Sequence, residues 1–211
     1  MRTCNLPILC ETTGIWKDSS VAWLMTSTTP PALLLIDVQN GFDEPRWGAR
    51  NNPQAEQRIA DLLSAWRKAA WPVIHVQHMS TEPASPLRPD RPGNAFKPEA
   101  MPRDGEPVFQ KKVNSAFIGT TLETYLRQEK ISGLVVAGLT TDHCVSTTVR
   151  MAGNLGFDVI LVDDATATND RIGPDGVVYP ADQVHRLTLA SLHGEFARVR
   201  SAADVLATVS A

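Results

Sequence analysis

The sequence has few cysteines, no long apolar run and no excess of basic residues. Its 211 residues include only Cys4, Cys10 and Cys144, an odd and sparse set that makes a poor disulfide framework and favours a reducing, cytoplasmic location. The longest apolar runs, such as residues 32–36, are far too short to cross a bilayer. The net charge of −3 gives no electrostatic footprint for nucleic acid or an anionic membrane. We therefore expect neither as a partner.

The first 29 residues differ from the rest of the chain. Residues 1–24 show no periodicity, and Glu11, Lys17 and Asp18 interrupt any apolar core of a signal peptide. Met25 is followed by the polar stretch "TSTTPP". We expect residues 1–29 to be a poorly ordered extension with Met25 as the natural start. The alternative is an arm that docks on a partner subunit.

Residues 30–211 show a regular alternation of strand and helix patterns, without an internal repeat or a linker, and are expected to form one domain. The predicted helices open near residues 53, 120, 144, 183 and 202. Buried strands are predicted at residues 32–38, 73–76, 108–110, 134–138, 158–162 and 196–199. This alternation predicts an α/β fold, a doubly wound and mostly parallel sheet with helices on both faces.

Two of these helices carry specific signals. Asn52 and Pro53 suit the N-cap and first position of a helix. Thr120 and Glu123 have the spacing of a capping box. The first helix should bury one face, because its large apolar residues fall at i, i+3, i+4 and i+7: Ile59, Leu62, Leu63 and Trp66.

Residues 79–107 form a long predicted loop that contains seven prolines. A structureless loop of this length is unusual in a compact domain unless it is functional. Proline restricts φ and lowers the entropy lost on ordering, so the loop can be a stable lid. We expect its apolar residues Phe96 and Met101 to be buried, either on their own subunit or at a subunit interface.

Three polar residues follow predicted strands. Asp37, Lys111 and Cys144 should meet at the carboxyl edge of the sheet, where ligands of such folds bind. An acid, an ammonium and a thiol together can form a nucleophilic site, and a helix N-terminus plus a nearby cation should lower the pKa of the thiol. Taken singly, each residue also has an ordinary structural role. Cys144 could be a small buried hydrophobic residue, Asp37 a turn residue and Lys111 a solvated surface residue.

Four segments in order resemble the isochorismatase-like cysteine hydrolase superfamily: "LLLIDVQNGF", "KKVNSAFIGTTL", "VVAGLTTDHCVSTTVRMAGNLGF" and "VDDATAT". The resemblance covers residues 30–205 and implies a three-layer α/β/α fold with an Asp37–Lys111–Cys144 triad. The spacing of four residues to Ser115 selects Lys111 over its neighbour Lys112. The resemblance also implies a cis peptide between Leu139 and Thr140, and an oxyanion hole formed by the N–H groups of Thr140 and Cys144.

The activity implied by the resemblance is hydrolysis of a C–N bond, amide or ureide, in a small molecule through a thioester on Cys144, as in amidohydrolases. True isochorismatases usually lack this cysteine. A homo-oligomer, dimer or tetramer, is also implied. Candidate substrate-binding residues are Gln39, Phe42, Trp47, His78 and Phe117. Of these, Gln39 would orient the loop that carries Asp37, with a surface turn residue as the alternative. The aromatic residues have core packing as their alternative.

No metal or other cofactor is expected. Nicotinamidases bind a metal through an Asp-x-His motif after the second strand, and here His78 and Ser80 stand at those positions. Nicotinamidase activity therefore remains only a second alternative. The first alternative is a catalytically weak or inactive relative that acts as a redox-sensitive thiol or binding protein, because a thiol beside a lysine is also oxidisable.

Overall fold

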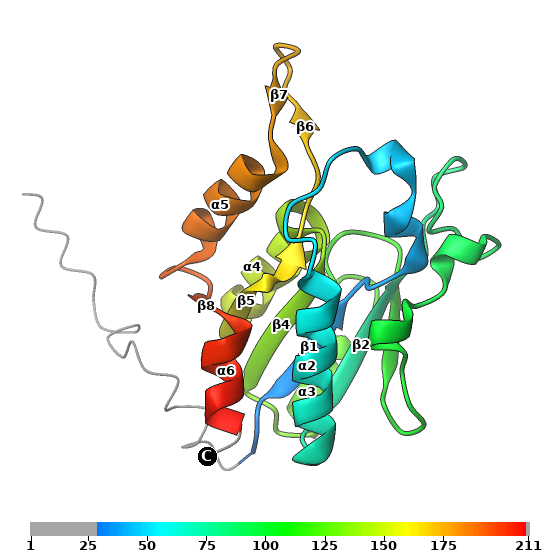
Figure 1. Cartoon of the computed structure of the whole chain (residues 1–211). Helices are drawn as coiled ribbons and strands as arrows, with labels where there is room; N and C mark the ends of the chain where they lie inside the picture. The colour runs from blue at the N-terminus through cyan, green and yellow to red at the C-terminus, as the bar shows by residue number, and fades with distance from the viewer. Residues whose placement is uncertain (1–28, 210–211) are drawn as a thin grey trace, which may run out of the picture.

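The computed structural model describes residues 29–209, and at its centre lies a six-stranded sheet in the order β3-β2-β1-β4-β5-β8 (Figure 1). Every pairing within this sheet is parallel. The strands are β1 Ala32–Ile36, β2 Val73–His78, β3 Val108–Lys111, β4 Gly133–Leu139, β5 Asp158–Ala167 and β8 Arg198–Arg200. The helices are α2 Ala55–Lys68, α3 Leu122–Gln128, α4 Ser146–Asn154, α5 Ala181–Leu192 and α6 Ala202–Val209.

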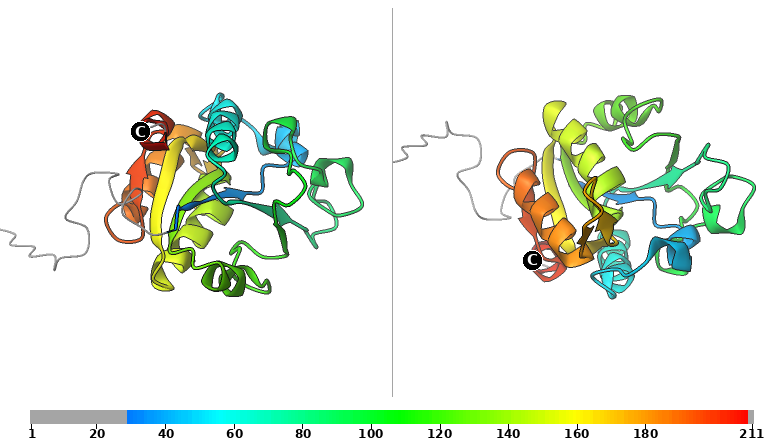
Figure 2. Two further views of the ribbon diagram at one scale, coloured as in Figure 1. Left: turned by 90° about the horizontal axis from the view of Figure 1, so that it is seen from below. Right: turned by 90° about the horizontal axis from the view of Figure 1, so that it is seen from above.

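Helices cover both faces of the sheet, which gives the three layers seen edge-on in Figure 2. Alternate residues of each strand point to opposite faces, so a buried parallel strand feeds two cores. Leu33 and Leu35 of β1 pack with the apolar faces of α2 and α6. Leu34 and Ile36 pack with α3, α4 and the end of α5. The predicted doubly wound α/β fold is confirmed.

The direction of winding reverses between β1 and β4. From β1 the chain adds β2 and β3 on one side, and from β4 it adds β5 and β8 on the other. At such a switch point the connections leave in opposite directions and open a crevice beyond the carboxyl ends of the two strands. Asp37 follows β1 and Cys144 follows β4, so both lie at this crevice.

The capping signals in the sequence predicted the starts of two helices incorrectly. The α2 helix begins at Ala55 instead of Pro53, because Asn52 has φ 44° and its amide donates to the carbonyls of Asp163 and Thr166. The capping box before α3 does not form: Thr120 accepts from Leu122 N–H, and Glu123 pairs with Arg127 on the surface. The face of α2 formed by Ile59, Leu62, Leu63 and Trp66 is buried as predicted.

A hairpin between β5 and α5 has no counterpart among the predicted elements. Its antiparallel strands β6 (Arg171–Ile172) and β7 (Val178–Tyr179) are two residues each, and it projects from the body of the domain (Figure 1). Strands this short leave no apolar run for a sequence pattern to detect. Ile172 is 76% exposed and Val178 55%.

The proline-rich loop packs on its own subunit. Its residue Asn94 is buried and donates to the carbonyls of His78 and Leu87, while Lys97 pairs with Glu56 of α2 at 2.9 Å. Phe96 is half-buried, with its ring edge-on to His75. Met101 is 50% exposed, so the expected burial on the same subunit is wrong for this residue. Burial of Met101 by a second subunit stays a prediction.

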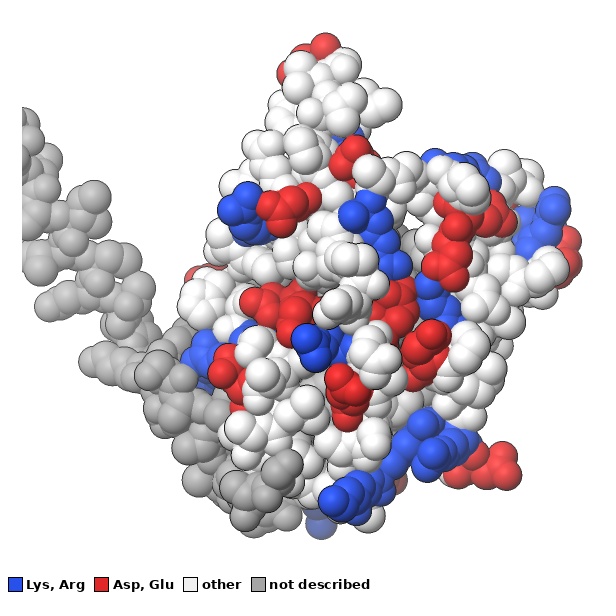
Figure 3. All heavy atoms as spheres, in the orientation of Figure 1, with Lys and Arg blue, Asp and Glu red and all other residues white. Residues whose placement is uncertain are grey.

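Charges of both signs are interspersed over the face formed by α2 and α6 (Figure 3). Arg58 of α2, for example, lies within 4 Å of both Asp61 and Asp164. No helix in residues 29–209 combines the length and apolar character needed to span a membrane.

Gly138 allows β4 to approach β1 at the switch point. Its φ is +129°, and a Cβ built on it would lie 2.1 Å from the backbone oxygen of Ile36. The pairing of β4 with β5 also shifts register between Val136 and Gly138. A side chain here would push apart the two strands that carry Asp37 and Cys144.

We expect Gly138→Ala to lower the free energy of unfolding by about 4 kcal/mol or more, since the clash is with backbone that cannot rotate away. Gly156→Ala is the matched control, because its φ of +82° is also positive but open space surrounds it. The control should lose only about 1–2 kcal/mol from backbone strain. Denaturant unfolding of both variants measures the difference, and equal losses would show that the close approach is not limiting.

Candidate active site

Each of the three predicted catalytic groups is placed by the end of a strand. Asp37 directly follows β1 and has φ 51°, a left-handed conformation that ends the strand and that Asp tolerates better than most residues. Lys111 is the last residue of β3. Cys144 lies in a π-helical turn, Thr141–Val145, between β4 and α4. The predicted helix opening at Cys144 therefore begins two residues later, at Ser146.

The ammonium of Lys111 joins the site together. Its Nζ donates to Asp37 Oδ2 at 2.6 Å, to His78 Nδ1 at 2.9 Å and to Cys144 Sγ at 3.2 Å. The side chains of Lys111 and Asp37 are both completely buried. Three acceptors match the three N–H bonds of an ammonium, so the buried cation is fully satisfied. Lys112, by contrast, is exposed.

His78 is a neutral fourth member of this cluster. Burial, and next the Lys111 charge, lower the pKa of His78 to about 4. The imidazole is therefore uncharged near neutral pH, and because Nδ1 accepts from Lys111, its proton is on Nε2. The main chain of His78 is held by Gln39, whose Oε1 accepts from His78 N–H at 2.9 Å and whose Nε2 donates to His78 O at 3.2 Å.

The protonation of the thiol differs from the sequence expectation. Burial, followed by the Asp37 carboxylate, raises the pKa of Cys144 well above its usual range, and the opposing effect of Lys111 is smaller. Burial likewise raises the pKa of Asp37 against the opposing effect of Lys111. The expected lowering of the thiol pKa is wrong, because the thiol is buried and the ammonium beside it is shared with a carboxylate. The resting site holds a thiol beside a carboxylate of increased basicity.

One oxygen of that carboxylate is available. Asp37 Oδ1 is buried and has no hydrogen-bond partner among residues 29–209, while Oδ2 binds Lys111. Ligand atoms of Asp37, His78 and Cys144 all lie within 4.8 Å of one another, a set that could hold a metal ion. The Lys111 ammonium contacts all three residues and stands where such an ion would bind, so these residues do not fit a resident metal. That none binds stays a prediction.

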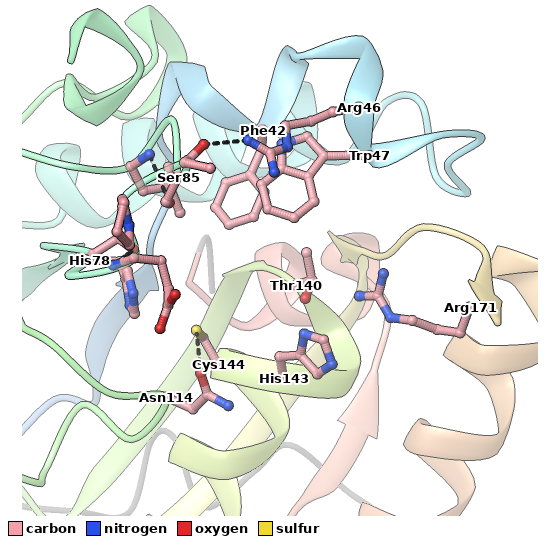
Figure 4. Close-up of a pocket in the computed structure, with 15 residues that line it drawn as sticks. Phe42, Arg46, Trp47, His78, Ser85, Asn114, Thr140, His143, Cys144 and Arg171 are labelled. Atoms are coloured by element: carbon pink, nitrogen blue, oxygen red, sulfur yellow. Dashed lines mark hydrogen bonds between the residues drawn. The ribbon is translucent and has the colours of Figure 1, made fainter. Parts of the chain in front are cut away.

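A cavity of about 490 Å³ opens above Cys144 (Figure 4). Of the predicted substrate-binding residues, Phe42, Trp47 and His78 line it, together with Thr140 of the predicted oxyanion hole. The rings of Phe42 and Trp47 lie 5.6 Å apart and point toward Cys144. Residues 82–85 and 87 of the proline-rich loop also line the cavity, so this loop contributes to the cavity of its own subunit.

Two predicted substrate-binding residues lie outside the cavity. Phe117 stacks on Phe157 with ring centroids 5.9 Å apart, as part of the core beneath α4. Gln39 is completely buried and its amide binds His78 and Asn94. These contacts suit a residue that orients a loop, as expected, better than one that binds substrate.

Several cavity residues were not predicted. Asn114 Oδ1 accepts a hydrogen bond from the Cys144 thiol at 3.7 Å. Its position in "KKVNSAF", three residues after Lys111, could have indicated that it lies near the site. Arg171 donates to both oxygens of Asp142, at 2.7 and 3.0 Å, and so ties the nucleophile turn to the base of the hairpin. Arg46 and His143 also line the cavity. Arg171 was not predicted because it lies on the hairpin, which the sequence pattern did not reveal.

The segment before Cys144 is held by further contacts. The peptide bond between Leu139 and Thr140 is cis. The carbonyl of Thr140 accepts from the N–H groups of His143 and Val145, both at 3.2 Å. The hydroxyl of Thr141 is hydrogen-bonded to Nδ1 of the buried His185 in α5, at 2.9 Å. The turn that presents the thiol is thus fixed on several sides.

A parallel α/β sheet with a buried Asp–Lys–Cys cluster at its switch point defines a class of cysteine hydrolase, and comparison with known proteins agrees. The Isochorismatase domain model matches residues 31–204. The isochorismatase family protein YrdC of Bacillus subtilis is 47% identical over 168 residues, which cover 80% of this chain and 90% of that protein.

Solved structures and enzymes of known name agree with this assignment. The crystal structure of an isochorismatase-family protein from Chromobacterium violaceum has a TM-score of 0.83 at 53% identity, covering 85% of this chain and 93% of that one. Ureidoacrylate amidohydrolase RutB of Klebsiella pneumoniae is 28% identical over 172 residues, 64% of this chain and 72% of that protein. The chain belongs to the isochorismatase family, and it is a hydrolase.

We expect Cys144 to react slowly with iodoacetamide in the free protein. Its raised pKa keeps the thiol protonated, so alkylation at pH 8 should be at least about tenfold slower than that of a free cysteine. Asp37→Asn should accelerate alkylation, because the carboxylate that raises the pKa is gone while Lys111 remains. Peptide mapping by mass spectrometry resolves Cys144 from Cys4 and Cys10. Rapid labelling of the wild type at pH 6 would instead indicate a resting thiolate.

Proposed function

We propose that this hydrolase cleaves the C–N bond of a small amide or ureide through a thioester on Cys144. The observation that carries the proposal is the buried Lys111 ammonium, which joins Asp37 to Cys144 at the floor of a cavity. The name of the related amidohydrolase supports C–N hydrolysis. A thiol is the nucleophile of choice for such acyl transfer when an adjacent base can take its proton.

The first half of the reaction forms the thioester. Asp37 accepts the thiol proton as Cys144 Sγ attacks the carbonyl carbon, and the carbonyl oxygen becomes an oxyanion. The backbone N–H groups of Thr140 and Cys144 stabilise that oxyanion. When the tetrahedral intermediate collapses, Asp37 returns the proton to the departing nitrogen, which leaves as a neutral amine or as ammonia.

Hydrolysis of the thioester reverses these roles. Asp37 takes a proton from water as the water oxygen attacks the thioester carbon. The second tetrahedral intermediate expels the Cys144 sulfur, which recovers the proton from Asp37 and regenerates the thiol. Lys111 donates to both groups and stabilises whichever of them, carboxylate or thiolate, is negative. His78 positions the ammonium as a neutral acceptor and offers its Nε2–H to the cavity.

Two observations support this proposal over its alternatives. A redox-sensing thiol is typically of low pKa and accessible, whereas Cys144 is buried and its pKa is raised. Nicotinamidase activity would need a metal site, and His78 is committed to Lys111 instead. The first observation favours hydrolysis over redox sensing, and the second favours hydrolysis without a metal.

Cys144→Ala should abolish ammonia release from an amide panel without unfolding the chain, because a small side chain at a turn leaves little cavity. Lys111→Ala should lower the rate by about a hundredfold or more, since the buried carboxylate and thiol lose their shared cation.

Lys112→Ala is the matched control and should change the rate little, because Lys112 is exposed. A chelator should likewise leave the wild-type rate intact. Activity of Cys144→Ala within about tenfold of the wild type would contradict the nucleophile assignment. A larger loss for Lys112 than for Lys111 would contradict the choice of lysine.

We also propose that the protein is a homo-oligomer. Ile172 and Val178 on the projecting hairpin and Met101 on the proline-rich loop are each at least half exposed in a single subunit, and a second subunit packed on the hairpin or the loop would bury them. Sedimentation at micromolar concentration should give a dimer or a larger assembly. A monomer under these conditions would contradict the proposal.

A further inference from the structure

We infer that the cavity accepts an amide whose acyl group is uncharged and apolar, either aliphatic or aromatic, and disfavours acyl groups that carry a carboxylate or an ammonium. This inference rests on the proposed function and deepens it by naming the substrate class. It follows from the walls of the cavity and from the pairing of the charges around it.

The walls beside Cys144 are apolar on two sides. Phe42 and Trp47 extend their rings toward the thiol from the segment after β1 (Figure 4). Pro83, Ala84 and Leu87 face the same space from the proline-rich loop. A hydrocarbon acyl group between these walls would lose its contact with water and gain contact with both walls, which favours its binding.

The cations nearest the reaction centre are already neutralised. Lys111 pairs with Asp37, and Arg171 donates through Nε and Nη2 to both oxygens of Asp142. A substrate carboxylate could recruit Lys111 only by displacing the completely buried Asp37, and the charge of Arg171 is already balanced by Asp142. Such a displacement would leave a largely buried anion without its partner.

Two residues of opposite charge lie at the rim of the cavity. Arg46 and Glu82 both line the cavity and form no salt bridge among residues 29–209. Arg46 donates to the carbonyl of Ala84 and lies over the Trp47 ring at 5.7 Å, so it holds the two apolar walls together. Glu82 offsets its charge. The cavity therefore offers little net attraction to an anion or to a cation.

The remaining polar groups suit a neutral amide. His78 presents an N–H from an uncharged ring, and Thr140 and Asn114 add a hydroxyl and a carboxamide. Such groups orient a neutral amide head by hydrogen bonds. The volume of about 490 Å³ suits a small molecule whose acyl group is a ring or a short chain.

The test compares amides with the same chain or ring whose acyl groups differ in whether they carry a terminal charged group. Hexanamide is compared with the monoamide of adipic acid and with the amide of aminocaproic acid, and benzamide with the monoamide of terephthalic acid. Ammonia release by the wild-type protein should give a kcat/KM at least about tenfold higher for the neutral member of each set. A preference for the acid would overturn the inference and make Arg46 the anchor. A preference for the ammonium compound would overturn it in favour of Glu82.

Variants of the apolar wall provide a second readout. Phe42→Ala and Trp47→Ala should raise KM for hexanamide at least about tenfold, but should change KM for acetamide little, since acetamide does not reach the wall. Trp47 donates to the Gly41 carbonyl, so Trp47→Phe keeps the apolar face if the alanine variant does not fold. Leu187→Ala, at an apolar residue of α5 that is 62% exposed, is the control. Equal KM changes for both amides would overturn the role of the wall.

Binding to Cys144→Ala separates this inference from the proposed function. Calorimetry with the same amides should show tighter binding of hexanamide than of its charged analogues. If the wild type hydrolyses no amide but this order of binding holds, the proposed function fails and the inference stands. If amides are hydrolysed without regard to charge, the proposed function stands and the inference fails. Tighter binding of a charged analogue, or no binding of any, also overturns the inference.

Discussion

The ion pair between Lys111 and Asp37 imposes the central constraint on this molecule. Both side chains are completely removed from water, and an ammonium in that position is tolerated only when each of its N–H bonds finds an acceptor. The acceptors come from the ends of β1 and β2 and from the turn after β4. Three parts of the sheet edge must therefore be placed to within a few tenths of an ångström for the fold to contain this cation.

The same cluster determines where the reactive proton is held. One cation is balanced by one carboxylate, and the imidazole and thiol beside them are uncharged because burial disfavours further charge. In the proposed mechanism, Cys144 becomes nucleophilic only as its proton passes to Asp37. Such a site would react with a bound carbonyl in preference to small electrophiles in solution, which would separate catalysis from adventitious oxidation.

Sequence patterns predicted the parts of the structure that depend on periodic burial. Strand positions, the buried face of α2 and the meeting of Asp37, Lys111 and Cys144 at one edge all follow from alternation and topology. Patterns failed where a side chain has two compatible roles. Phe117 could line a cavity or fill the core, and only the position of Phe157 decides. Asn52 could cap a helix or bind the carbonyls of Asp163 and Thr166, more than a hundred residues away.

The thiol pKa shows a different limit. A cation next to a thiol lowers its pKa, and sequence spacing alone suggests that pair. The outcome depends on burial and on the carboxylate that shares the cation, and both are three-dimensional quantities. The cavity walls could not be predicted from sequence spacing for the same reason, because Arg46 and Arg171 meet their partners only when the loops fold.

Charge and shape are thus supplied by different parts of the fold. The sheet edge carries Asp37, His78 and Lys111, whose positions are fixed by strand pairing such as that of His78 with Lys111. The cavity walls come from the loops after β1 and β2, which are joined by the hydrogen bond from Arg46 to Ala84. Loop residues can change without disturbing the buried ion pair. A family built on this plan can keep one reaction while the apolar walls and rim charges alter the acyl group that it accepts.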